Sequence, residues 1–134
     1  MRYIPQQHPM GCMIAATAMI LDMSYEEVAE AIPLPDMEAL RLTGRNSLGL
    51  KAFDDMKVLA EARGMRMLDF ESKPETLEAG LRYMGMLATP DPLIKHVVAI
   101  DEQGVVFDPD PTKEQSRENW RAYDFITMLE FQPQ

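Results

Sequence analysis

Residues 11–23 are almost wholly apolar, and this stretch constrains the fold more than any other feature of the chain. At helical spacing it has no polar side to face water, and a helix that is apolar all round lies at the centre of a protein. The stretch is too short to cross a membrane, which takes about 20 residues. The chain is therefore expected to wrap its other elements around one buried helix.

Length and charge narrow the classes of protein that remain. The 134 residues are 46% hydrophobic and 26% charged, which is typical of one globular domain spanning residues 1–134. A net charge of −9 leaves no basic surface for nucleic acid or for anionic membranes. A single cysteine predicts a reducing compartment. We expect a mature, cytoplasmic chain without membrane insertion.

Two further helices are marked by their capping residues. Ser24 followed by Glu27 matches the capping box, and Pro33 ends the helix that this pair begins. Ser47 caps another helix, which carries its apolar residues on one face and ends at Gly64. These patterns predict that the first half of the chain is helical.

The connection between these two helices has room for a short helix over residues 37–42. Residues 65–70 then predict a strand. Ser72 with Glu75 repeats the capping pattern and predicts a fourth helix that ends near Gly85.

Strand patterns gather in the last third of the chain. They cover residues 86–89, 94–100, 105–107 and 123–131. Because the helices come first and most of the strands come late, the sequence predicts an α+β fold in which an antiparallel sheet packs on a helical half.

Cys12 falls in the first turn of the predicted central helix. A helix N-terminus carries partial positive charge and unpaired N–H groups. Both stabilise a thiolate, which is the nucleophilic form of cysteine. A free cysteine is also a common buried residue. Position alone therefore allows either a nucleophile or a residue of the core.

Two other side chains match what a cysteine nucleophile needs. The amide of Gln6 can donate to an oxyanion together with the backbone N–H of Cys12. Gln7 is chemically equivalent, and only spacing favours Gln6. His96 begins a late strand and is the better candidate for the general base, because His8 lies only four residues from Cys12 in the segment leading into the helix.

The group that orients the imidazole is expected to be Asp108 or Asp110, each of which precedes a proline. A three-residue hairpin loop ending at Gly104 would place Asp110 opposite His96 and Asp108 diagonal to it on the same face. A two-residue loop would place Asp108 opposite Val97, on the other face. The chemistry requires the three-residue loop, and the register alone leaves both aspartates open.

The order of these residues resembles that of papain-like cysteine peptidases: Gln6, Cys12 at the start of an apolar helix, His96 in a late strand, and Asp108–Pro109 after the next strand. More narrowly, it resembles the C39-like group, which comprises domains that cleave double-glycine leader peptides in bacteriocin exporters and their stand-alone relatives. The matching segments are residues 6–32, Thr43-Gly44-Arg45-Asn46-Ser47-Leu48 before a helix ending at Gly64, and residues 96–109.

The resemblance implies a papain-like fold, with the nucleophile helix packed on the C-terminal antiparallel sheet. It implies that Cys12 is the nucleophile, His96 the base and Asp108 the orienting acid, with Gln6 lining the oxyanion hole. The implied activity is that of a thiol-dependent hydrolase, a cysteine peptidase acting on a peptide or protein. We expect no cofactor, and one cysteine with two scattered histidines does not make the spacing of a zinc site.

The sequence also departs from the family, which usually shows a glycine just after the cysteine and an acidic or polar residue before it. Here Gly11 precedes Cys12, and Met13 follows it. Two alternatives stay open on the same fold: a module that binds peptides without cleaving them, and an acyl transferase or deamidase. A third is a small structural protein in which Cys12 is only a core residue.

Overall fold

The apolar stretch forms α1 (Cys12–Leu21), and every residue of this helix except Met13 is buried. The computed structural model describes residues 1–34, 36–43, 47–70 and 72–134. The helix α2 (Tyr25–Ala31) and the strands β2 (Arg82–Ala88) and β3 (Lys95–Ile100) pack against α1. The central position predicted for this helix is confirmed.

The helices that follow begin and end close to where the sequence places them. Ser24 and Glu27 form the predicted capping box, each accepting a hydrogen bond from the other's backbone N–H at 3.1 Å. Next come α3 (Met37–Thr43) and α4 (Ser47–Ala62), after which Gly64 adopts a positive φ of 77°. Residues 35 and 44–46, part of the connection and of the stretch that resembles the family, lie outside the described residues.

The strands form one antiparallel sheet in the order β1-β5-β2-β3-β4. The elements not yet bounded are β1 (Met65–Phe70), β4 (Val106–Phe107) and β5 (Thr127–Pro133). The last strand, β5, lies between β1 and β2 and pairs with both of them. Helices that precede most of the strands, and a sheet that is antiparallel throughout, confirm the α+β class.

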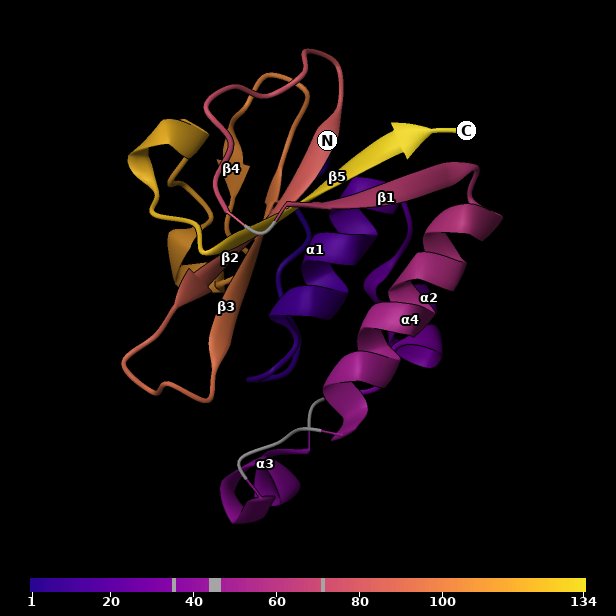
Figure 1. Cartoon of the computed structure of the whole chain (residues 1–134), viewed down its shortest axis with the longest axis vertical. Coiled ribbons are helices and arrows are strands. Elements are labelled where there is room, and N and C mark those ends of the chain that lie inside the picture. Colours follow the sequence, from indigo (N-terminus) through magenta and orange to yellow (C-terminus); the bar gives the residue numbers. More distant parts are fainter. Residues whose placement is uncertain (35, 44–46, 71) are drawn as a thin grey trace.

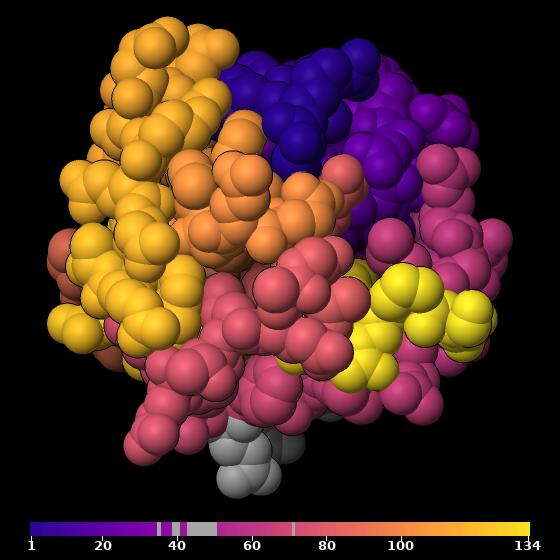
Figure 2. Space-filling model, turned by 90° about the horizontal axis from the view of Figure 1, so that it is seen from above, coloured from indigo at the N-terminus to yellow at the C-terminus, as the bar shows by residue number. Residues whose placement is uncertain are grey.

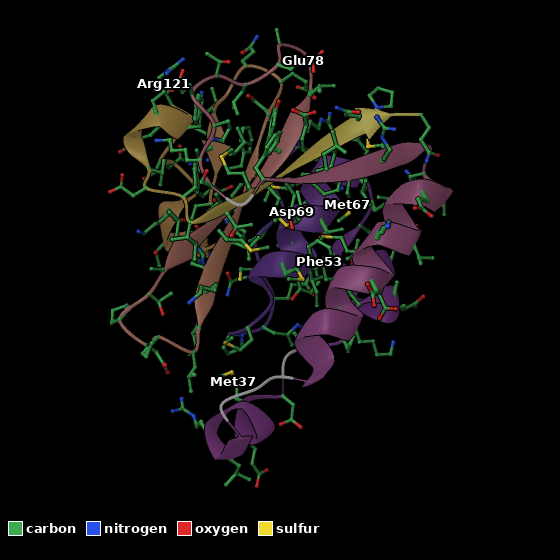
Figure 3. All side chains as sticks on the ribbon, viewed as in Figure 1. Met37, Phe53, Met67, Asp69, Glu78 and Arg121 are labelled. Atoms are coloured by element: carbon green, nitrogen blue, oxygen red, sulfur yellow. The ribbon has the colours of Figure 1, made fainter. Side chains whose placement is uncertain are left out.

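Both faces of this sheet are covered, so the molecule has two cores. Buried residues of α1, α2 and α4 pack on one face, where Phe53 of α4 and Met67 of β1 also lie (Figure 3). The other face carries a second cluster around Tyr83, Trp120 and Phe125. The helices and the irregular segments on the two sides of the sheet can be followed in Figure 1, where α3 stands apart from the rest.

The prediction of a fourth helix beginning at Ser72 is wrong. In the described residues from Ser72 onward the chain is irregular until β2 begins at Arg82. Pro74 and Gly80, the latter at a φ of 86°, leave too few residues between them for a stable helix. The segment instead covers the second core with Leu77. It lies beside the segment that leads into β5, as Figure 2 shows from above.

The strand predicted over residues 86–89 begins earlier, at Arg82, and contains Gly85 instead of starting after it. A Cβ on Gly85 would lie 2.4 Å from the ring of Phe125, so this glycine allows the ring to pack against the strand. Two other strand boundaries also shift. The closing strand is Thr127–Pro133, and β4 is only two residues long.

None of the helices in the described part of the chain is both long enough and apolar enough to span a bilayer.

Candidate active site

The hairpin between β3 and β4 has the three-residue loop. Ala99 pairs with Phe107 and Ile100 with Val106, and Val105 O accepts a hydrogen bond from Asp101 N at 3.0 Å. Gly104 ends the loop with a φ of 78°, a conformation that costs glycine little. This register places His96 and the aspartates that follow β4 on one face, as the triad chemistry requires.

His96 is bonded to Asp108, the diagonal aspartate. The distance between His96 Nε2 and Asp108 Oδ1 is 2.7 Å, the length of a charge-assisted hydrogen bond. The carboxylate is nearly enclosed, with 3% of Asp108 exposed, whereas the imidazole is partly open to solvent. Asp108 Oδ1 also accepts from the backbone N–H of Asp110 at 2.9 Å, which holds the carboxylate in a tight turn.

Asp110, the aspartate directly opposite in the register, has a different task. Its Oδ1 accepts from the backbone N–H of Thr112 at 3.0 Å and from Oγ1 of the same residue at 2.8 Å. It thereby caps the 3-10 helix η1 (Pro111–Lys113). The hydrogen bonds from Thr112 lower the pKa of Asp110, and the charge of His96 adds a smaller lowering.

Cys12 and His96 meet at this site, although they are far apart in the sequence. The hydrogen bond with Asp108 and the nearby Cys12 side chain raise the pKa of His96 to about 10, against the smaller effect of burial. Asp108 occupies Nε2, so Nδ1 is the ring nitrogen left for the thiol. Cys12 is 8% exposed.

Gln6 lies in the turn before α1, and its amide closes that turn. Its Nε2 donates to the carbonyl oxygens of His8 and Pro9, both at 3.1 Å. A carbonyl oxygen can only accept a hydrogen bond. The NH₂ end of the Gln6 amide must therefore be the end that faces these two carbonyls. Within the described residues Oε1 is buried without a hydrogen-bond partner. The amide that the sequence assigns to an oxyanion hole is therefore engaged with its own turn.

The segment that carries Gln6 is also tied to the segment that carries Asp108. Gln6 N donates to Pro109 O at 2.9 Å, and Tyr3 Oη donates to Asp110 O at 3.1 Å. These two hydrogen bonds join the segment of residues 3–6 to the segment of residues 109–110. Tyr3 had no signal in the sequence, because a tyrosine near a chain start is unremarkable in composition and spacing.

The described residues contain no cluster of three or more histidine, cysteine, aspartate or glutamate side chains placed to hold a metal ion.

Two solved structures share this fold over nearly the whole chain. The peptidase domain of Streptococcus ComA, a bifunctional ABC transporter involved in a quorum-sensing pathway, matches with a TM-score of 0.65 and 14% identity. The peptidase domain of Streptococcus mutans ComA matches with a TM-score of 0.57 and 13% identity. Each match covers 99% of this chain and 100% of the other. No family model and no curated protein matches the sequence.

The chain therefore has an α+β fold of the C39-like peptidase-domain type. More particularly, its architecture is similar to that of the ComA peptidase domains.

Proposed function

We propose that this protein is a cysteine peptidase in which Cys12 is the nucleophile, His96 the acid–base group and Asp108 the residue that orients His96. The observation that carries the proposal is the 2.7 Å bond between His96 Nε2 and Asp108 Oδ1, with Cys12 close enough to the same ring to raise its pKa. The likeness to peptidase domains supports it through the fold.

In the first half of the reaction, the Cys12 thiolate attacks the carbonyl carbon of a peptide bond. A carbon–sulfur bond forms, and the carbonyl electron pair moves onto the oxygen. The backbone N–H of Cys12 lies in the first turn of α1, where N–H groups have no partner within the helix, and it stabilises this oxyanion. The intermediate then expels the amine, which takes its proton from the His96 imidazolium.

In the second half, His96 is neutral and acts as the base. It removes a proton from a water molecule, whose oxygen attacks the thioester carbon. Collapse of this second intermediate breaks the carbon–sulfur bond, releases the carboxylic acid and returns Cys12 to the thiolate. Asp108 holds the ring for both steps and stabilises its charged form.

Gln6 joins this mechanism as a second oxyanion donor when its amide turns from its own loop toward the site. In the present arrangement both carbonyls of the turn hold the amide. A substrate carbonyl that becomes an oxyanion is a stronger acceptor than either of them, because charge-assisted hydrogen bonds are roughly twice as strong.

The proposal is tested by incubating the protein with a library of peptides and identifying new termini by mass spectrometry. We expect one preferred bond to be cut by the wild type and none by Cys12→Ala. An acyl adduct on Cys12, absent from the alanine variant, would identify the intermediate. A wild-type chain that neither cuts a peptide nor forms an adduct between pH 6 and 8 would overturn the proposal.

The engaged amide of Gln6 favours a second candidate, a module that binds peptides without cleaving them. With only one oxyanion donor free, such a site holds a peptide but stabilises its transition state weakly. In the same experiment this candidate predicts retention of defined peptides on the immobilised wild type without new termini. An acyl transferase would instead attach an added primary amine to the acyl group.

A further inference from the structure

The helix that carries Cys12 begins without a side-chain cap. Its N-cap residue is Gly11, which has no side chain, and within the described residues α1 has no side-chain cap. Where α1 starts, and so where the Cys12 sulfur lies, is therefore set by the turn of residues 6–11. Inside this turn, Gly11 N donates to His8 O at 2.9 Å, the carbonyl that Gln6 also binds.

This turn is fastened from outside by the first turn of α2. His8 Nδ1 lies 2.9 Å from Tyr25 Oη, and the two rings stack with centroids 5.7 Å apart. Beside them, Gln7 Nε2 donates to Glu26 Oε1 at 3.0 Å. Two consecutive residues of the turn are thus held by two consecutive residues of α2.

The Tyr25 hydroxyl occupies the space that a side chain at the N-cap would need. A Cβ built on Gly11 would lie 2.1 Å from Tyr25 Oη. Tyr25 is 2% exposed. Burial raises its pKa, hydrogen bonding by the backbone amides of Gln7 and His8 opposes this, and negative charge on Cys12 adds to the rise. The hydroxyl therefore lies at the start of α1, against Gly11.

We propose that Tyr25 is a positioning residue for the nucleophile: its hydroxyl, bonded to His8 and seated against Gly11, sets the start of α1 and thereby the placement of Cys12. This inference rests on the proposed function, because it assigns a role in the reaction to a residue that touches no substrate. It also explains why glycine precedes Cys12. Only a residue without Cβ leaves room for the hydroxyl.

The test replaces one hydroxyl at a time. Tyr25→Phe keeps the ring and removes the bond to His8. Tyr83→Phe is the matched control, because Tyr83 is 1% exposed and its hydroxyl donates to Glu130 at 2.5 Å in the second core, away from α1. Tyr83→Phe removes two hydrogen bonds, one to Glu130 and one from the backbone N–H of Glu78, so a purely structural role predicts at least as large an effect from Tyr83→Phe as from Tyr25→Phe.

Alkylation of Cys12 by iodoacetamide at pH 7 provides the main measurement. We expect Tyr25→Phe to slow it about 3- to 10-fold, the factor that corresponds to one net hydrogen bond, and Tyr83→Phe to leave it unchanged. With a cleaved peptide, Tyr25→Phe should lower kcat and leave KM unchanged, since the substrate contacts are intact. Equal alkylation rates in the two variants would overturn the inference.

A rescue experiment tests the contact between residue 11 and the Tyr25 hydroxyl. If the contact exists, a second substitution should raise the alkylation rate instead of lowering it further. Gly11→Ala forces a Cβ against Tyr25 Oη and should slow alkylation more than Tyr25→Phe does. In the double variant the hydroxyl is gone and the nearest remaining ring atom lies 3.2 Å away, so alkylation should recover above the Gly11→Ala rate. A double variant slower than either single one would refute the contact. If alkylation follows these expectations and no peptide is cut, the proposed function fails and the positioning role stands.

Discussion

Replacing Asp108 with asparagine should damage the site far more than the same change at Asp110. Asparagine has nearly the shape of aspartate, and its side-chain oxygen can still accept from His96 and from the backbone N–H of residue 110. The change therefore removes the charge while leaving a side chain of the same size. Asp108 is 3% exposed, so water does not replace what is lost.

The size of the effect follows from the bond that is weakened. A hydrogen bond to a charged group is worth about 1.5–3 kcal/mol, and each 1.36 kcal/mol changes a rate or population tenfold. Asp108→Asn should therefore slow Cys12 alkylation at neutral pH by about 10- to 150-fold. Asp110 acts on His96 only through space, and its oxygen stays available as a cap after substitution by asparagine. Asp110→Asn should change the rate by less than about 3-fold, as expected of an exposed charge pair.

The assay is unambiguous because Cys12 is the only cysteine in the chain. The alkylated fraction is followed by intact mass over time, from pH 5 to 9, with urea unfolding of each variant to show that it is folded. Asp108→Asn should also shift the alkylation profile to higher pH. Without the carboxylate the protonated form of His96 is less stable, and less thiolate then forms beside it. A silent Asp108→Asn beside a damaging Asp110→Asn would refute the assignment.

Two further predictions concern stability. Because the bond to Asp108 and the nearby Cys12 raise the pKa of His96 from 6.5 to about 10, the folded chain holds a proton that the unfolded chain releases. The difference in unfolding free energy between wild type and His96→Gln should be complete below pH 6.5 and shrink as pH rises toward 10; a gap that grows would contradict this. Gly85→Ala places a Cβ 2.4 Å from the Phe125 ring and should cost about 1–3 kcal/mol in urea unfolding, with an unchanged midpoint as the contrary result.

Sequence patterns predicted the helical half well, because the decisive signals there are local. An all-apolar helix can only be central, and the capping box of Ser24 and Glu27 forms as its spacing predicts. The same four-residue pattern at Ser72 failed. A cap lowers the cost of starting a helix, but the short run before Gly80 has too few turns to repay that cost. A capping motif therefore predicts a helix only when an amphipathic run of adequate length follows it.

The contact between Tyr25 and the turn before Cys12 could not be predicted from sequence patterns. The contact joins residues 17 positions apart, and nothing in the periodicity of α2 connects it with residues 6–11. One signal was present: a glycine stands at the N-cap, where serine, threonine, aspartate or asparagine is usual. Glycine is also accepted at this position, and it leaves space for another group. Here that group is the Tyr25 hydroxyl.

The choice between the two aspartates shows where register stops being informative. The three-residue loop that the chemistry requires is present, but the register leaves both aspartates open, with Asp110 directly opposite His96 and Asp108 diagonal to it. What decides between them is the backbone after β4. Asp108 follows directly on the strand and forms a turn in which its own Oδ1 accepts from Asp110 N, so its carboxylate is fixed while it bonds to the imidazole. The same turn leads Asp110 into its role as the cap of η1.

Two prolines, each following one of these aspartates, remove the N–H groups that would extend the β3–β4 ladder. The ladder therefore ends at Phe107, and beyond it the residue nearest the last strand pair, not the one opposite in the extrapolated register, is bonded to His96.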